Sequence, residues 1–399
     1  MTSWKHFNGC SVFVIIGCII SLRNSLLVLK QYYRGHTHQF SDKIDIPIIS
    51  SSSTYVEVTH QAKHIEQHDE SLSHKGSRER RETSAGCLLI MDDNHFLIEW
   101  IAYHYHVVNL RHLIVAIDPR SQELPDEIVQ RWSDHMNISV WYNYSDYRLS
   151  NETAILEAEE RVQIVLRNAK EPYNYNLIQH RARQRLFYSQ CMIEHQQSSL
   201  NRGWTLFLDT DEFVSINYPM MSTLRPFYHL NDITIPSVSE PGSVLKLLQL
   251  EQVYFNKEVQ QSNNMTSSPC IQIPRFRYGT MEVPTTIKQS SLPKMINTSH
   301  FATLRWQIHA KTNNYSMNRI SKTIIDLSRI SAEELYNNFP IVESIHKPLP
   351  LHCARRKLHI RSTQQIFIIH HYLGTHEQYT FRKDSRSRNE RNEKVRIIM

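Results

Sequence analysis

Residues 203–216, GWTLFLDTDEFVSI, join a strongly apolar run to a cluster of acids. The run WTLFL has the length of a buried strand, and it ends abruptly in Asp209, Asp211 and Glu212. If the strand continues, Asp209 and Asp211 point the same way, because side chains alternate along a strand. Two carboxylates so placed can bind a hard cation, Mg²⁺ or Mn²⁺, and leave positions for phosphate oxygens. The structural alternative is a surface turn whose acids face water.

Two earlier apolar runs end in the same way. Residues 87–91 lead into Asp92, and residues 113–117 lead into Asp118. Helical patterns lie between the runs, so the chain is predicted to be an α/β protein with a mostly parallel sheet flanked by helices. In such sheets the ligand crevice lies beyond the carboxyl ends of the strands. We therefore expect Asp92 and Asp118 to share one rim with the DTD tripeptide and to contact the ligand.

The composition excludes several classes of protein. The formal net charge of +6 is concentrated in the tail 381–399, which reads as a solvated basic end, and the remainder is nearly neutral. Nucleic-acid binding needs a broad basic face, so it is not expected. The nine glycines form no G-x-G-x-x-G or Walker-type loop, so a nucleotide would not be bound by a Gly-rich turn. A metal on paired aspartates offers another way to neutralise its phosphates.

The N-terminus predicts membrane targeting. Residues 9–22 carry no charge, and extension to Leu29, with Arg23 reaching the interface, makes the segment long enough to span a bilayer. An uncleaved signal anchor is favoured over a signal peptide because no small-residue cleavage site is obvious. Residues 35–85 are rich in Ser, His and charges and read as a flexible stem, with its histidines solvated rather than metal-binding.

Glycosylation and cysteine patterns favour the secretory pathway. Six N-x-[ST] sequons begin at Asn137, Asn143, Asn151, Asn264, Asn297 and Asn314, which predicts a luminal location for that region. The four cysteines beyond the stem form no C-x-x-C pair, so a zinc ribbon is not expected. They could make two disulfides in any of three pairings, or remain thiols, and at least one disulfide is favoured in an oxidising compartment.

At this point the chain resembles a known family. The segments CLLIMDDNHFLIEWIAYHYHVVNLRHLIVAID, WTLFLDTDEF, RFRYGT, SKTIIDL and IIHHYLGTHEQYTFR occur in the order seen in glycosyltransferase family 92 and its relatives. The resemblance covers roughly residues 86–385. It implies a GT-A-like fold, a type II membrane protein of the Golgi or another secretory membrane, and inverting transfer of a hexose, often galactose, from a nucleotide sugar to a glycan. It divides the chain into an anchor (1–34), a stem (35–85), a transferase domain (86–380) and the basic tail (381–399).

The resemblance also assigns residue roles. Asp209 and Asp211 match the metal-binding D-x-D, and His371 matches a late histidine that is a candidate third ligand for Mn²⁺ or Mg²⁺. Glu99 matches a position near the donor, and Asp118 a contact to its base or ribose. Lys322, with Arg275 and Arg277, is a candidate phosphate contact; the alternative for each is an ordinary packed or exposed side chain.

The catalytic base has two candidates. Inverting transfer requires a carboxylate to take the proton of the acceptor hydroxyl. Glu282 is preferred because it follows RYGT, with Glu240 as the alternative, and Glu212 is expected to orient the loop beside the metal.

Two other classes of function remain open. A luminal sulfotransferase would need a basic loop after its first strand, where this chain has two aspartates. A non-catalytic sugar- or nucleotide-binding relative is harder to separate, although loss of the D-x-D would be expected in it. The segment 231–269 lacks the family's usual acceptor pattern, so the acceptor stays open.

Overall fold

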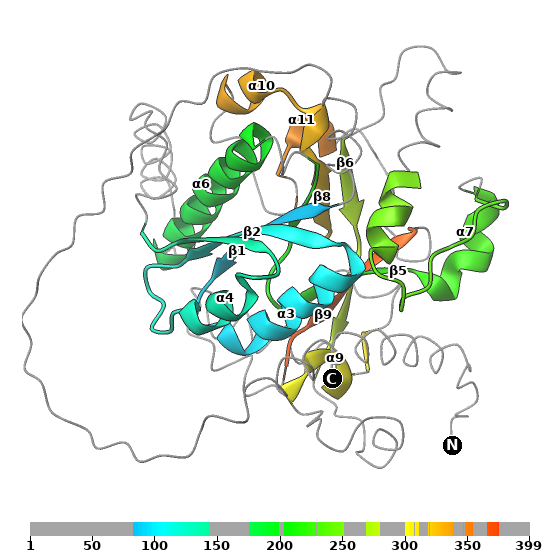
Figure 1. Ribbon diagram of the computed structural model, residues 1–399, viewed down its shortest axis with the longest axis horizontal. Coiled ribbons are helices and arrows are strands. Elements are labelled where there is room, and N and C mark those ends of the chain that lie inside the picture. The colour runs from blue at the N-terminus through cyan, green and yellow to red at the C-terminus, as the bar shows by residue number, and fades with distance from the viewer. Residues whose placement is uncertain are drawn as a thin grey trace, which may run out of the picture.

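A computed structural model describes residues 83–143, 175–198, 203–227, 230–250, 269–279, 300–306, 308–310, 318, 320–337, 346, 348–353 and 365–374 (Figure 1). The predicted anchor, almost all of the predicted stem and the basic tail lie outside these residues. The first element of the described residues is β1, which begins at Ser84. Within the described ranges, no helix is both long and apolar enough to cross a membrane.

The regular elements follow the predicted alternation in the first half of the domain. The strands are β1 (Ser84–Ile90), β2 (Leu110–Ile117), β3 (Asn137–Trp141), β4 (Trp204–Phe207), β5 (Glu212–Ile216), β6 (Cys270–Ile273), β7 (Arg275–Tyr278), β8 (Lys322–Asp326) and β9 (Phe367–Tyr372). The labelled α-helices are α3 (Asn94–Val107), α4 (Asp126–Trp132), α6 (Tyr175–Gln197), α7 (Met221–Phe227), α9 (Ala302–Arg305), α10 (Ala332–Asn337) and α11 (Pro350–Cys353). Residues 243–250 are also helical. Short 3₁₀ turns lie at Tyr218–Met220 and Leu327–Arg329.

Six strands form the main sheet, in the order β3-β2-β1-β4-β8-β6. The first four are mutually parallel, and β8 runs antiparallel between β4 and β6. The prediction of a mostly parallel sheet in an α/β protein is confirmed. Because β2, β1 and β4 are neighbours, their carboxyl ends meet at one rim.

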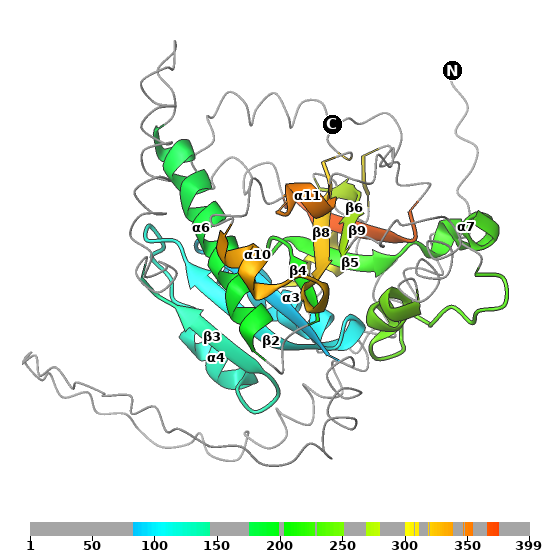
Figure 2. The same cartoon turned by 90° about the horizontal axis from the view of Figure 1, so that it is seen from above.

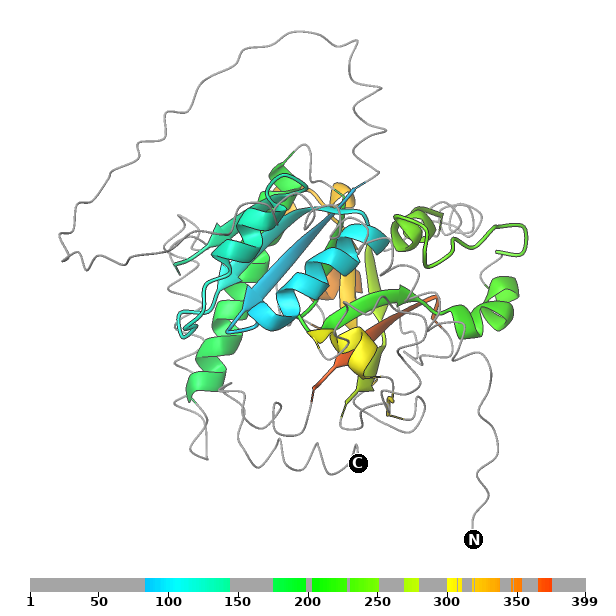
Figure 3. The ribbon, with the colours of Figure 1, turned by 60° about the horizontal axis from the view of Figure 1, so that its bottom comes forward.

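Helices cover both faces of this sheet because apolar residues occupy both sides of its central strands. Leu88 and Ile90 belong to the core shared with Leu97 and Trp100 of α3. On the other face, Cys87 packs with the apolar side of α6. Figure 3 shows α3 running alongside β1, and Figure 2 shows α10 beside α6.

A second sheet of three strands, in the order β5-β9-β7, lies beside the first (Figure 3). The predicted strand through WTLFLDTDEF is therefore divided: β4 ends at Phe207, and Glu212 begins β5 in the other sheet. The expectation that Asp209 and Asp211 share one face of a continuing strand is wrong. The acidic residues form the connection between the two sheets instead.

Two disulfides join distant parts of the fold. Cys87 of β1 is bonded to Cys191 of α6, and Cys270 of β6 is bonded to Cys353 of α11. The expectation of at least one disulfide is confirmed. Of the three possible pairings, the structure has Cys87 with Cys191 and Cys270 with Cys353. Each bond fixes a helix to the main sheet.

Candidate functional site

The rim at the carboxyl ends of β2, β1 and β4 carries the three predicted groups of aspartates. The backbone N–H of Asp118, just after β2, donates to the carbonyl of Ile90 at the end of β1, at 2.8 Å. Asp92 follows β1, and Asp209 and Asp211 follow β4. The predicted convergence on one rim is confirmed.

Glu212 shapes the loop that carries the acids. Its Oε2 accepts a hydrogen bond from the backbone N–H of Asp209 at 2.9 Å, and its own N–H donates to the Asp209 carbonyl at 3.1 Å. These reciprocal bonds close residues 209–212 into a turn. The loop-orienting role expected of Glu212 is confirmed.

Two buried cations balance part of this negative charge. Lys322, whose side chain is 0% exposed, places Nζ 2.8 Å from Asp209 Oδ2 and 3.0 Å from Glu212 Oε2. These contacts are ion pairs by distance rather than aligned hydrogen bonds. Arg275 Nη1 donates to Glu212 Oε1 at 2.8 Å, and its Nε donates to the carbonyl of Ile320 at 2.6 Å. Lys322 thus contacts two acids of the loop, Asp209 and Glu212, and its contact with a phosphate stays a prediction.

His371 lies between the other carboxylates. Its Nε2 is 3.4 Å from Asp211 Oδ2, and its Nδ1 is 3.8 Å from Glu212 Oε1. Asp211, Glu212 and His371 offer ligand atoms within 4.8 Å of one another, which is compact enough for one metal ion. Asp211 and His371 are brought together as predicted. Glu212 joins them, and Asp209, which was expected there, is paired with Lys322.

Burial sets the protonation of this group. It lowers the pKa of His371 below its ordinary value, although Asp211 acts in the opposite direction. The imidazole is therefore neutral near pH 7 and keeps a lone pair for a metal. Burial and the neighbouring Asp211 act to raise the pKa of Asp209, but Lys322 and His371 together lower it below its ordinary value. Asp209 is therefore ionised, and its side chain is 39% exposed.

The cross-strand register explains why these side chains meet. Glu212 of β5 lies opposite His371 of β9, and His371 lies opposite Arg277 of β7. Arg275 is two residues from Arg277 and therefore shares its face. One face of the small sheet thus carries a buried polar row, whose register no local pattern in the sequence reveals.

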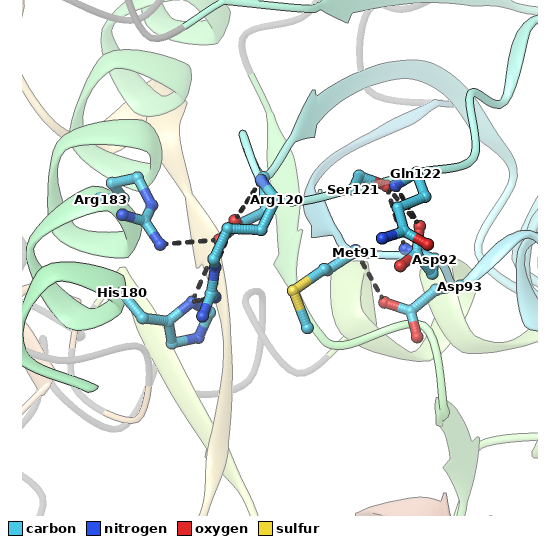
Figure 4. Close-up of polar contacts among 9 residues, drawn as sticks. Met91, Asp92, Asp93, Arg120, Ser121, Gln122, His180 and Arg183 are labelled. Atoms are coloured by element: carbon cyan, nitrogen blue, oxygen red, sulfur yellow. Dashed lines mark hydrogen bonds and ion pairs between the residues drawn. The ribbon is translucent and has the colours of Figure 1, made fainter. Parts of the chain in front are cut away.

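The other half of the rim is basic as well as acidic (Figure 4). The buried carboxylate of Asp118 accepts from Arg120 Nε at 2.9 Å and from Arg183 Nη2 at 3.1 Å, and His180 Nδ1 lies 3.4 Å away. Although burial alone would raise it, His180, Arg120 and Arg183 together hold the pKa of Asp118 far below its usual range. The contacts of Asp118 are thus protein groups, and a role in binding base or ribose stays a prediction.

Asp92 fixes the loop after β2. Its Oδ1 accepts from Ser121 Oγ at 2.9 Å and from the backbone N–H groups of Gln122 and Glu123 at 2.7 and 3.0 Å. Asp92 itself has a positive φ of 56°, which places its side chain over that loop. Its observed contacts stabilise the loop, and donor binding by Asp92 stays a prediction.

Glu99 is engaged away from the acidic loop. Its buried carboxylate accepts from the backbone N–H groups of Ala302 and Thr303, at 2.7 and 3.1 Å, and from the Thr303 hydroxyl. These are the first residues of α9, so Glu99 caps that helix from α3. Burial raises the pKa of Glu99 to about 7, against the effect of its hydrogen bonds. A donor contact by Glu99 stays a prediction, whereas its capping contacts are structural.

Of the two candidates for the catalytic base, only Glu240 lies within the described residues. Glu282 lies outside the described residues, and Glu240 forms an exposed ion pair with Lys246. His346 is an additional group beside the cluster: burial, with the nearby charges of Lys322 and Arg275, lowers its pKa to about 3. No motif in the sequence around His346 indicated that this residue lies near Lys322 and Arg275.

No model of a known protein family matches the chain, and no curated protein matches it either. Its function is therefore argued from the rim and from the polar row beside it.

Proposed function

We propose that the chain is a metal-assisted glycosyltransferase with a GT-A-like fold, which transfers a hexose from a nucleotide sugar to a glycan with inversion. The observation that carries the proposal is the group formed by Asp211, Glu212 and His371. It lies where β4 ends, at the rim where open α/β sheets bind ligands.

The residues present suit a divalent cation. His371 Nδ1 is buried and makes no hydrogen bond with any residue that the structure describes, and its neutral ring can act as a ligand. Carboxylate oxygens suit Mg²⁺ and Mn²⁺, and one imidazole in the set favours Mn²⁺. When bound, the ion would supply Lewis-acid stabilisation of negative charge on a departing diphosphate.

The chain's own cations support the same chemistry. Lys322 and Arg275 lie against Asp209 and Glu212, so their fixed positive charge limits the repulsion between the acids of the group that would hold the ion. Glu282 remains the proposed base for the acceptor hydroxyl.

Two further observations support a luminal enzyme anchored by its N-terminus in the Golgi or a related membrane. Both disulfides suit an oxidising compartment. Of the six sequons, the two within the described ranges, Asn137 and Asn143, are exposed, as glycosylation requires.

The test is a donor screen with the full-length chain. Nucleotide sugars would be assayed for transfer and hydrolysis with Mn²⁺, with EDTA, and in an Asp211→Asn variant. Asp134→Asn is the matched control, because Asp134 is exposed, lies just after α4, and loses the same charge. We expect turnover of one donor class that needs both metal and Asp211. Donor binding without turnover in the presence of glycan acceptors would favour a non-catalytic relative, and failure of every donor to bind would refute the proposal.

A further inference from the structure

The cluster around Asp118 holds more positive than negative charge. Asp118 supplies one carboxylate, and Arg120 and Arg183 supply two guanidinium groups, so the sum is +1 before His180 is counted. A structural ion pair needs only one arginine for one acid. The second arginine therefore carries a positive charge that no acid of the cluster balances.

The hydrogen-bond inventory gives the same result. Two guanidinium groups carry about ten N–H donors together, and three bonds from them reach the Asp118 carboxylate. Arg120 Nη2 also lies 3.5 Å from His180 Nδ1. Arg183 Nε is buried and has no hydrogen-bond partner among the residues that the structure describes. An unpaired buried donor is costly, so an acceptor is expected beside Arg183.

The cluster is held in place and is partly exposed to solvent. The loop that carries Arg120 is fixed from both sides, because Asp118 Oδ1 accepts from the Arg120 backbone N–H at 3.0 Å and Asp92 holds Ser121 and Gln122. The side chains of Arg120, His180 and Arg183 are 33%, 24% and 15% exposed, respectively. Figure 4 shows these three side chains turned toward one another, from the loop after β2 and from α6.

We propose that Arg120, Arg183 and His180 form a binding site for a phosphate group, and that Asp118 is a positioning residue beneath it. A phosphate dianion complements the surplus charge, and its several oxygens can accept from two guanidinium groups that approach from different elements. The site is distinct from the group of Asp211, Glu212 and His371, and it needs no metal.

The experiment is isothermal titration of inorganic phosphate into the full-length chain in the presence of EDTA. We expect saturable binding that weakens about ten- to a hundredfold in Arg183→Gln, as for the loss of a charge-assisted hydrogen bond. Arg120→Gln should give a similar loss of affinity. Because Arg120 is more exposed than Arg183, this variant tests the proposal if Arg183→Gln does not fold. Arg181→Gln, an exposed arginine on the same helix, removes equal charge and should leave binding unchanged.

The phosphate can be free or part of a nucleotide, and two further titrations distinguish these sources. Tighter binding of uridine or adenosine monophosphate than of inorganic phosphate would identify a nucleotide, and equal affinity would identify free phosphate. Absence of saturable phosphate binding, or equal loss in Arg181→Gln, would overturn the proposal. Asp211→Asn should keep phosphate binding, so the result is independent of the transferase proposal.

Discussion

Lys322 offers the sharpest test of how the acidic loop is stabilised. The substitution Lys322→Met keeps an unbranched side chain of similar length and removes the ammonium that contacts Asp209 and Glu212. Removal of one partner from a buried ion pair costs about 3–5 kcal/mol, because the other partner is left unpaired in a low dielectric. Asp209 is partly exposed and Glu212 keeps Arg275, so we expect the lower value, about 3 kcal/mol.

The assay is thermal unfolding with and without Mn²⁺. At about 2–4 °C per kcal/mol for a domain of this class, the melting temperature of Lys322→Met should fall by roughly 6–12 °C. The three carboxylates and the two cations that contact them, Lys322 and Arg275, sum to −1, and the variant sums to −2. Arg277, on the same face, adds the same charge to both. Mn²⁺ should therefore bind the variant more tightly and raise its melting temperature more than that of the wild type.

Lys246→Met is the matched control, because Lys246 pairs with Glu240 on the surface and exposed pairs contribute little. If Lys322→Met melts like Lys246→Met, the ion pairs of Lys322 do not stabilise the loop. If Mn²⁺ stabilises wild type and Lys322→Met equally, Lys322 does not compete with a metal for these carboxylates.

Three other predictions concern the metal group, a titrating acid and a disulfide. Asp211→Asn should weaken Mn²⁺ binding, measured by isothermal titration, more than Asp209→Asn does, because Asp211 lies with His371; the reverse order would favour the predicted D-x-D set. Glu99 has a folded pKa of about 7, above its ordinary value of 4.5, so the folded chain holds the proton more tightly and stability should fall as pH rises from about 4.5 to about 7. Chemical denaturation across that range should show a flatter profile in Glu99→Gln, and an unchanged slope would contradict the assignment. Replacement of Cys270 and Cys353 together by alanine should cost about 2–5 kcal/mol in urea unfolding, and no loss would argue against that pairing.

Four strands of the main sheet, β1, β2, β3 and β4, could be predicted because their signals are local. Each of β1, β2 and β4 is a short apolar run that ends in aspartate, and parallel neighbours bring such ends to one rim. The division between β4 and β5 could not be predicted in this way. Apolar residues continue on both sides of the DTD tripeptide, and nothing in that pattern states that the chain passes from one sheet to another.

The partners of the predicted acids depend on tertiary structure instead. Glu212 meets Arg275, 63 residues later, only because β5, β9 and β7 align in one small sheet. Asp118 meets Arg183, 65 residues later, because α6 packs across the main sheet. Spacing in the sequence carries no information on either pair. The sequence therefore indicated that these acids meet at one rim, but not which side chains contact them.

The two halves of the rim consequently differ in the sign of the charge that they would bind. At the end of β4, two carboxylates and an imidazole offer ligand atoms to one site, and this set of donors favours a cation. At the end of β2, Arg120 and Arg183 exceed Asp118 by one charge, which favours an anion. β1 separates these two strand ends, so they lie about 10 Å apart at the usual spacing of about 4.8 Å between strands. A ligand that carried phosphate could interact with either half, and only variants that change the halves separately, such as Asp211→Asn and Arg183→Gln, can assign its phosphate to one of them.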